Sequence, residues 1–536
     1  MALHQVFLVF LAFGLAVFAQ SEFQHVFEKS NKQPGTIFHH PIQRVAVVGA
    51  GPAGLQAAAK LIEHNFTVRL FERAPHPGGK LALQRKLLRD EPTGTTDQIP
   101  AQLPTSRYHS EGDDGLTLKH RWTEHWRPRP VWYNLFTNSP KASTELPDVP
   151  YEPETPWVLS HHTIQRHVRS YATHHCLNSN DYCPRTPGAP RVTSYSTRVE
   201  KVEKDEETHT WVLTLRRLEQ LPESNRLREE WWTETFDAVV LASGPYTSAH
   251  VPDIEGIVDW SKAREGEQYS IYHSQAYRHP ERYAGKTVLI VGASVSASEI
   301  ARDLGPFVHR IIASVRPPKV PRPPRLRSLS RFPNITEFVP EIASFEPLKS
   351  HAEGIRSGRI HLMNGSILQG VDEIILATGY RSHSLYPPNT TTRRPENISW
   401  TGHYVPDPTL AFTIGRPWTV GRYQSYGLAK VWEGSAPLPP PEQPPTEPNP
   451  GTGMWFPEAM FRQYITWLND ASLEHGGRFV EPLPIENVEL LKYYAVVHFL
   501  NNTMSLDNIG LNSVSMFGKL EVEDPWDALA DEGLDW

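Results

Sequence analysis

The chain has 536 residues, of which 39% are hydrophobic and 10% aromatic, so it is long enough to bury a large core in about two to four domains. Its net charge of -7 at pH 7 and its isoelectric point near 6.4 provide no basic field for a phosphate backbone, which argues against a nucleic-acid-binding protein.

The chain begins with an apolar run, Val6–Phe18, which is followed by Ala19. This pattern predicts a secretory signal peptide over residues 1–19, although no Lys or Arg precedes the run. The run is shorter than the roughly 20 residues of a membrane-spanning helix, so a retained anchor is the second choice and a non-targeting apolar tail the third. We therefore expect the protein in the secretory pathway, either in the endoplasmic reticulum lumen or secreted.

Two further features concern the compartment. Sequons for N-glycosylation, which fit the secretory route when they lie on surface loops, occur at Asn65, Asn334, Asn364, Asn389, Asn397 and Asn501. Cys176 and Cys183 are the only cysteines and do not form a C-x-x-C pair, so no dithiol redox centre is predicted. A structural disulfide and two free thiols both remain open.

The first recognisable unit is a strand at Arg44–Val48, a GAGPAG turn, a helix and a second strand at Phe66–Glu72. The three glycines allow a tight turn, close approach of the backbone to a pyrophosphate and close packing of helix on strand, and the final acid can accept from a ribose hydroxyl. A purely structural glycine turn is the alternative. The predicted dinucleotide-binding residues of this unit are Gly49, Ala50, Gly51, Pro52, Ala53, Gly54, Glu72 and Gly79.

The middle of the chain is less regular. Residues 82–150 are rich in Pro, Trp, Arg and His without a sustained period, which predicts long loops and short elements that cover a site. A helix is expected at Thr163–Cys176, and hairpin strands are expected at Val192–Arg217 and Trp231–Ala242.

A second unit repeats the first, with strands at Lys286–Val291 and Arg310–Val315 around a GASVSA turn. Serine replaces the middle glycine, but it is small and its hydroxyl can bond a phosphate oxygen. No acid ends the second strand, and an arginine there attracts a 2′-phosphate, so NADPH is favoured over NADH. A solvated basic loop at Arg316–Arg331 is the alternative. The predicted cofactor-binding residues are Gly292, Ala293, Ser294, Val295, Ser296, Ala297 and Arg316.

The N-terminal unit is expected to hold FAD tightly, and the inserted unit is expected to bind an exchangeable NADPH. The predicted fold is therefore α/β, with two Rossmann-like dinucleotide-binding domains and the NADPH domain inserted into a discontinuous FAD domain. The FAD domain is expected at 40–260 and 366–520, with a Pro-rich loop at 437–451, and the NADPH domain at 261–365. Helices are expected at Glu458–Leu468 and Ile485–Phe499, before an acidic tail at 521–536.

These motifs resemble the flavin-containing monooxygenase family over most of Arg44–Gly434. Besides the two glycine turns, the resemblance rests on the segments YNLFTN at Tyr133–Asn138, ASGPY, HSQAY at His273–Tyr277, LATGY and DPTL. Tyr277 stands where the family's Baeyer–Villiger members have Trp, which implies oxygenation of a heteroatom. The chain departs from this fingerprint at Glu267 and Tyr269, where Phe and Gly are usual.

The resemblance implies a monooxygenase dependent on FAD and NADPH, which passes one oxygen of O₂ to a nitrogen or sulfur atom of a small molecule through a C4a-hydroperoxyflavin. Asn138 would be the catalytic polar residue beside the flavin, with a loop-capping Asn as the alternative. His273 is predicted to position the two domains rather than to shuttle protons. No metal and no nucleic acid is predicted, membrane contact is expected only if the N-terminal segment is retained, and the oligomeric state is not predicted.

Three other functions are compatible with parts of the pattern. A Baeyer–Villiger monooxygenase uses the same cofactors on ketones. An NADPH-dependent flavin reductase or oxidase shares the architecture, and its disulfide-reducing form needs the C-x-x-C pair that the chain lacks. A non-catalytic FAD-binding protein would not need the second nucleotide unit.

Overall fold

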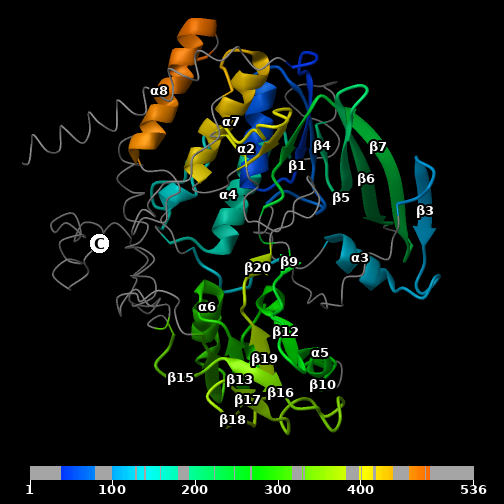
Figure 1. Ribbon diagram of the computed structural model, residues 1–536, viewed down its shortest axis with the longest axis vertical. Helices are drawn as coiled ribbons and strands as arrows, with labels where there is room; N and C mark the ends of the chain where they lie inside the picture. Colours follow the sequence, from blue (N-terminus) through cyan, green and yellow to red (C-terminus); the bar gives the residue numbers. More distant parts are fainter. Residues whose placement is uncertain are drawn as a thin grey trace, which may run out of the picture.

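In the computed structural model, five parallel strands form the sheet of the first domain (Figure 1). In order across the sheet they are β21 (Leu410–Phe412), β8 (Ala238–Leu241), β1 (Arg44–Val48), β2 (Thr67–Phe71) and β4 (Thr193–Ser194). Their side chains are buried almost throughout, as expected of parallel strands that are covered on both faces. Helices lie on one face, and an antiparallel sheet lies on the other.

The structure describes most of the chain between residues 38 and 482. The described residues are 38–78, 99–126, 129–137, 141–156, 158–178, 192–221, 224–244, 246, 248–265, 268–316, 329, 332–381, 397–399, 401–413, 418–438, 458–476 and 478–482. Several predictions fall outside them, namely those for the signal peptide, Gly79, Asn138, Cys183, most of the Pro-rich loop, the helix at Ile485–Phe499 and the acidic tail.

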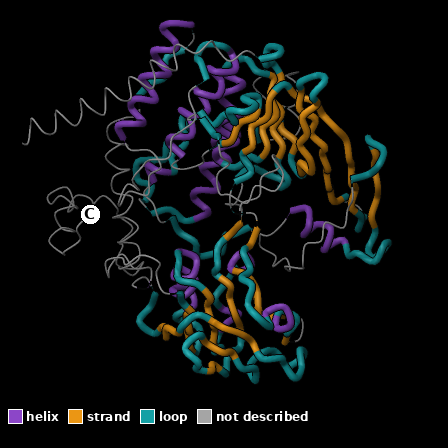
Figure 2. The backbone as a smooth tube through the Cα atoms, viewed as in Figure 1, coloured by secondary structure: helices purple, strands orange, loops and turns teal. Residues whose placement is uncertain are grey.

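The helical face of the first sheet is built from segments that are far apart in the sequence. The helices are α2 (Pro52–Glu63), α4 (His161–His174) and α7 (Trp418–Glu433), with α8 (Glu458–His475) packed outside α7. Figure 2 shows these helices grouped on one side of the strands of the upper domain. Because α7 comes from the C-terminal part of the chain and packs on α2, the first domain is discontinuous in sequence.

The other face carries a four-stranded antiparallel sheet in the order β3 (Thr105–His109), β7 (Leu227–Phe236), β6 (Thr210–Gln220) and β5 (Thr197–Asp205). Helix α3 (Leu118–Trp126) is attached to this sheet by ion pairs from Glu124 to Arg198 and Arg216. Burial opposes ionisation of Glu124, but the two guanidiniums outweigh it and lower its pKa to about 2. The predicted loop region 82–150 therefore contains a strand, this helix and a short 3₁₀ turn, Lys141–Ser143.

A second parallel sheet forms the core of the lower domain. Its order is β12 (Ile271–His273), β19 (Glu373–Leu376), β13 (Thr287–Val291), β14 (Arg310–Ser314) and β15 (Thr336–Val339), with α6 (Val295–Leu304) following β13. Smaller elements of this part are α5 (Ile257–Trp260), β10 (Arg264–Glu265), β11 (Gln268–Tyr269), β16 (Ile342–Phe345), β17 (Ile360–Leu362), β18 (Ile367–Leu368) and the 3₁₀ turns Ser274–Ala276 and Glu281–Tyr283. The two Rossmann-like domains of the predicted fold are thus confirmed.

The domain boundaries differ from those expected at residues 260 and 365. Trp260 is fully buried in the core of the second domain, where its ring lies 4.8 Å from that of Phe345. Strand β19 pairs with both β12 and β13, so the second sheet is complete only at Leu376. Both expected boundaries therefore fall inside the second domain, because local patterns do not reveal which sheet a strand joins.

The two domains meet where their sheets end. Strand β9 (Ser248–Ala249), which follows β8, pairs antiparallel with β20 (Tyr380–Arg381), which follows β19. The carboxyl ends of both parallel sheets therefore point toward this junction, as Figure 1 shows between the upper and lower domains. Ligands of open parallel sheets bind at such carboxyl edges.

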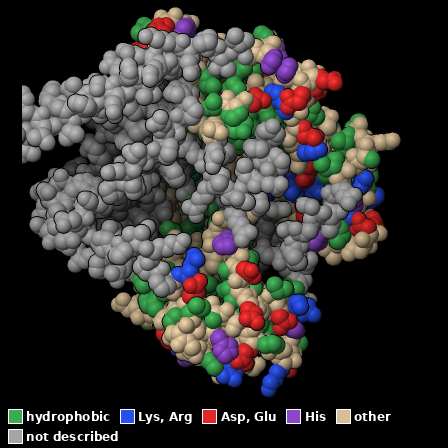
Figure 3. Space-filling model, in the orientation of Figure 1, with side chains coloured by type: hydrophobic (Ala, Val, Ile, Leu, Met, Phe, Trp, Pro, Cys, Tyr) green, Lys and Arg blue, Asp and Glu red, His purple; other side chains and the backbone are tan. Residues whose placement is uncertain are grey.

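The surface of the second domain carries charged side chains of both signs (Figure 3). On the face seen in Figure 3, acidic and basic side chains are interspersed over the lower domain. The ion pairs of this domain include Arg356–Asp372. Among the residues that the structure describes, no helix is both long and apolar enough to span a bilayer.

Candidate functional site

The turn after β1 is shaped so that only glycine fits at its start. Gly49 has φ +106° and donates its N–H to the carbonyl of Phe71 at 2.7 Å. A Cβ at Gly49 would lie 2.7 Å from the carbonyl oxygen of Ala242, and one at Gly54 would lie 1.9 Å from that of Gly49. The missing side chains thus let the turn pass between the ends of β2 and β8.

This turn opens a helix whose first N–H groups face the edge of the sheet. Helix α2 begins after Gly51, has Pro52 and Ala53 in its first turn and receives no hydrogen bond from a capping side chain. Such an end is suited to bind a pyrophosphate. Gly78, with φ +129°, donates to the carbonyl of Ala50 at 3.0 Å, which brings the chain just before Gly79 close to the turn.

Glu72 is held at this edge by three donors. Its carboxylate accepts from the N–H groups of Ala50 and Ala74, each at 2.9 Å, and from the guanidinium of Arg129 at 3.3 Å. These bonds fix the carboxylate while leaving lone pairs for ribose hydroxyls. The structure therefore places Glu72 where the sequence predicts it, at the end of β2 beside the glycine turn.

Arg129 is a site residue that sequence reasoning missed. Its side chain is buried, and burial lowers its pKa while the charge of Glu72 opposes that shift. An arginine in the Pro- and Trp-rich stretch before Val131, which also contains Arg127, carries no pattern that could reveal this pairing. Its role is to balance the charge of Glu72 in a buried place.

The turn after β13 repeats the geometry of the first. Gly292 has φ +122° and donates to the carbonyl of Ser314 at 3.0 Å, while a Cβ there would lie 2.5 Å from the carbonyl oxygen of Ala377. Ser294 precedes α6, is exposed and does not cap the helix with its hydroxyl, so this group is available to a phosphate. Ala297 is fully buried beneath the turn, which explains why a small residue stands there.

The remaining predicted residues of the second unit lie at the same edge. Ala293 is in the turn itself, and Val295 and Ser296 form the first turn of α6. Arg316 is exposed two residues beyond β14, the strand whose counterpart β2 ends before Glu72. The structure thus brings the predicted residues together in two groups, one at each sheet edge.

His273 ends β12 and has both ring nitrogens engaged by the backbone. Nε2 lies 3.0 Å from the carbonyl oxygen of Gly379, to which it donates, and Nδ1 accepts from the N–H of Gln275 at 3.1 Å. Burial lowers its pKa to about 4, against the opposing effect of the Gly379 carbonyl. The ring is thus tied to the chain just before β20, near the junction of the two domains, and its predicted role in positioning the domains stays a prediction.

Comparison with known proteins identifies the family. A family model described as pyridine nucleotide-disulphide oxidoreductase matches residues 43–320. A flavin-containing monooxygenase of Amanita muscaria is 32% identical over 505 residues, which cover 83% of this chain and 91% of the relative. The chain belongs to the flavin-containing monooxygenases. A second relative with that name, from Aspergillus flavus, is 30% identical over 482 residues, covering 80% of this chain and 92% of its own.

Solved structures agree with the fold. S-allyl-L-cysteine S-oxygenase from Allium sativum superimposes with a TM-score of 0.53 at 17% identity, covering 89% of this chain and 99% of that one. Tmm from Pelagibacter gives 0.53 at 15% identity, covering 86% of each chain. As a flavin-containing monooxygenase the protein uses FAD and NADPH, and the two glycine turns are the places that fit them.

The segment before Asn138 leads to the residue that is predicted to lie beside the flavin. Thr137 donates its N–H to the carbonyl of Leu159 at 2.8 Å, and its hydroxyl accepts from the N–H of Leu159 at 2.9 Å. This double contact fixes the chain at the residue that precedes Asn138. Asn138 itself lies outside the described residues, so its catalytic role stays a prediction.

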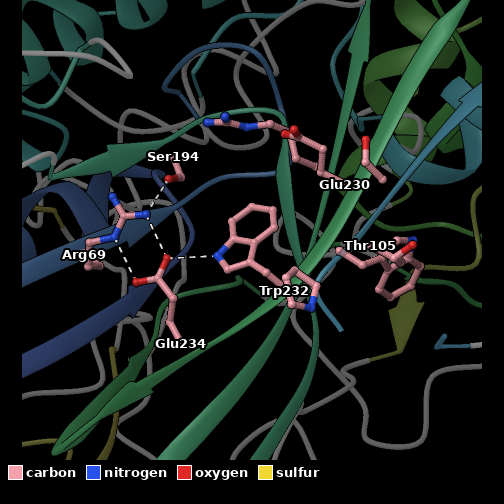
Figure 4. A pocket seen from close by; sticks show the side chains of 10 residues that line it. Arg69, Thr105, Ser194, Glu230, Trp232 and Glu234 are labelled. Carbon is pink, nitrogen blue, oxygen red and sulfur yellow. Dashed lines mark hydrogen bonds and ion pairs between the residues drawn. The ribbon is translucent and has the colours of Figure 1, made fainter. Parts of the chain in front are cut away.

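A groove of about 560 Å³ lies between β2 and β4 on one side and β3 and β7 on the other (Figure 4). Four of its polar side chains bind one another, since Arg69 donates to Ser194 and to both oxygens of Glu234, which also accepts from Trp232. These bonds tie β2 and β4 to β7, so the groove is a seam between the two sheets.

Arg316 offers a test of nucleotide specificity. Replacing Arg316 by Ala removes the cation expected to bind the 2′-phosphate, so kcat/KM for NADPH should fall about 10- to 100-fold while that for NADH changes little. Initial rates with each nucleotide measure the ratio. Arg310→Ala is the control, because Arg310 lies at the other end of β14, where it pairs with Glu337. An unchanged NADPH preference in Arg316→Ala would assign the 2′-phosphate to other residues.

Proposed function

We propose that this flavin-containing monooxygenase transfers one oxygen atom of O₂ to a nitrogen or sulfur atom of a small molecule. The other oxygen atom leaves as water, and NADPH supplies the two electrons. The observation that carries the proposal is the pair of matched glycine turns at Gly49 and Gly292, which open at the meeting edges of two parallel sheets. One turn suits a resident FAD and the other an exchangeable NADPH.

FAD supplies hydride acceptance and oxygen activation when it is bound, and the chain supplies binding, orientation and exclusion of protons. The Gly49 turn and Glu72 hold the pyrophosphate and ribose of FAD. Ser294 and Arg316 hold the phosphates of NADPH. His273 is neutral and has both nitrogens occupied, so it does not deliver protons to the site. Tyr277, rather than Trp, supports a heteroatom over a ketone as the acceptor.

The test uses the FAD-loaded protein. Anaerobic mixing with NADPH should bleach the flavin absorbance, whereas NADH should act at least about tenfold more slowly. Turnover in air with a panel of amines, thioethers and ketones should then give N- or S-oxygenated products by mass spectrometry. Ester products from ketones would instead establish Baeyer–Villiger chemistry, and hydrogen peroxide alone with every substrate would establish an oxidase or reductase.

We also propose passage through the secretory pathway with removal of residues 1–19. Two observations support it. Cys176 is disulfide-bonded, and the chain has one other cysteine, Cys183; such bonds persist in oxidising compartments. In addition, four predicted glycosylation sites lie on exposed described residues, namely Asn65, Asn334, Asn364 and Asn397.

The localisation is tested on the protein from its native cells. Endoglycosidase treatment should lower its apparent mass, and N-terminal sequencing should begin at Gln20. A chain that begins at the initiator Met, carries no glycan and fractionates with the cytosol would refute the proposal.

A further inference from the structure

A short segment of the first domain is fastened to both domains. Its residues, Val131–Thr137, are named the strap. Trp132 is buried in the hydrophobic core of the second domain, where its ring meets that of Tyr277 edge-on at 6.0 Å. The N–H of Tyr133 donates to the carbonyl of Arg278 at 3.0 Å, which ties the first half of the strap to the second domain. The carbonyl of Tyr133 also accepts from Nε2 of His161, in the first domain, at 3.0 Å.

The second half of the strap is fastened to the first domain. The carbonyl of Leu135 accepts from the N–H of His161 at 3.0 Å, at the start of α4, and Phe136 bridges to Ser160. Thr137 makes the double contact with Leu159 described above. A shift of the second domain would therefore pull on Thr137, the neighbour of Asn138.

One side chain of the second domain closes this connection. Asp303 lies in the last turn of α6 and accepts from the hydroxyl of Tyr277 at 2.6 Å on one oxygen and from the amide of Asn134 at 2.8 Å on the other. Burial raises the pKa of Asp303, and both hydrogen bonds oppose that rise. The same helix begins just after Ser294. Helix α6 therefore connects the nucleotide turn to the strap as a rigid element, about 12 Å long between Val295 and Asp303.

We propose that Asp303 is a positioning residue that couples NADPH binding to the strap. Thr137, the neighbour of Asn138, is then held in its position against Leu159 only when α6 lies against the strap. The proposal rests on the FAD- and NADPH-dependent function. Neither Asp303 nor Asn134 touches the two cofactor turns, and their effect runs through the strap. Loss of their contact should therefore weaken nucleotide binding and waste reduced cofactor as hydrogen peroxide without removing FAD.

The decisive variant is Asn134→Asp, at an exposed position where the substitution does not threaten folding. It sets two carboxylates against each other in place of the amide–carboxylate bond, and like charges so close cannot both ionise freely. Glu281 and His279 are the other titratable groups that act on Asp303. We expect Kd for NADP⁺ and the fraction of NADPH lost as peroxide to rise about fivefold at pH 8 and about twofold at pH 6.

The reciprocal double variant, Asn134→Asp with Asp303→Asn, restores both bonds of residue 303. Its amide nitrogen donates to the carboxylate at 134, which exchanges donor and acceptor in that bond, and its amide oxygen still accepts from the hydroxyl of Tyr277. The double variant should return both quantities to within about twofold of the parent protein. Asp259→Asn is the matched control, because Asp259 lies on α5 of the same domain and pairs with His351. A defect in Asn134→Asp that the double variant fails to repair would overturn the proposal.

Hydrogen exchange supplies a readout that does not depend on oxygenation. In the FAD-loaded protein without nucleotide, the amides of Tyr133 and Thr137 should exchange faster in Asn134→Asp than in the parent, and at the parental rate in the double variant. Equal exchange in all variants would overturn the proposal. If the parent protein yields no oxygenated product, the proposed function fails, while the exchange result still decides the coupling.

Discussion

Gly292→Ala is expected to abolish reduction by NADPH while leaving FAD bound. The residue has φ +122°, which L side chains rarely adopt, and an added Cβ would lie 2.5 Å from the carbonyl oxygen of Ala377. The turn would have to move away from the sheet edge, and a displacement of about 1 Å can cost about 100-fold in rate. Flavin absorbance of the purified protein measures the bound FAD, and anaerobic stopped-flow with NADPH measures its reduction.

The control for Gly292→Ala is Gly285→Ala. Gly285 also has a positive φ, +73°, but a Cβ there meets nothing within 4 Å, so this variant carries backbone strain without a clash. NADPH should bleach the flavin absorbance of Gly285→Ala at nearly the parental rate. The mirror variant, Gly49→Ala, should lose FAD itself, since its Cβ would meet Ala242. Normal reduction of Gly292→Ala by NADPH would mean that the second turn does not carry the nucleotide.

The two turns are predictable from sequence because each strand, glycine turn, helix and following strand forms one continuous pattern. In both units the glycine donates its N–H to the end of the following strand, at Phe71 and at Ser314. The carbonyls of Ala242 and Ala377, which leave no room for a Cβ, come from distant strands and are not visible in that pattern. The ribose partner Glu72 is found for the same reason. Family resemblance adds cofactor identity and chemistry, which spacing alone does not provide.

What the sequence does not reveal are contacts between distant segments. Arg129 reaches Glu72 from a stretch without periodicity, and Trp132 of the first domain inserts into the core of the second. Strand β19 joins the second sheet by pairing Glu373 with Val288, and most of the sequence of that domain lies between these two residues. Tertiary packing selects these partners, and no local propensity encodes them.

The protein is expected to lose stability steeply as the pH falls below about 6, because it buries neutral imidazoles. Burial lowers the pKa of five nearly inaccessible histidines. The pKa falls to about 4 in His161, His167 and His273, to about 3 in His403, and well below its ordinary value in His125. Their ordinary pKa is near 6.5, so the unfolded chain binds more protons than the folded one between pH 6.5 and 4. The stabilisation is present above pH 6.5 and is lost on acidification through this window.

The size of the effect follows from the number of protons. Each proton taken up on unfolding contributes about 1.4 kcal/mol per pH unit, so five contribute up to about 7 kcal/mol per unit, a large part of a typical folding free energy. Denaturant unfolding at pH 7.5, 6.5 and 5.5 measures the slope.

His167→Gln isolates one of these protons. The Nε2 atom of His167 accepts from the N–H of Leu146 at 3.0 Å, and a glutamine oxygen can take over this bond without titrating. The slope of unfolding free energy against pH should fall by about a fifth, or roughly 1.4 kcal/mol per pH unit. His475→Gln, at the exposed end of α8, should leave the slope as it is. If the slope of unfolding free energy against pH in His167→Gln equals that of the parent protein, this imidazole does not take up a proton on unfolding. The loss of stability in acid would then come from other groups.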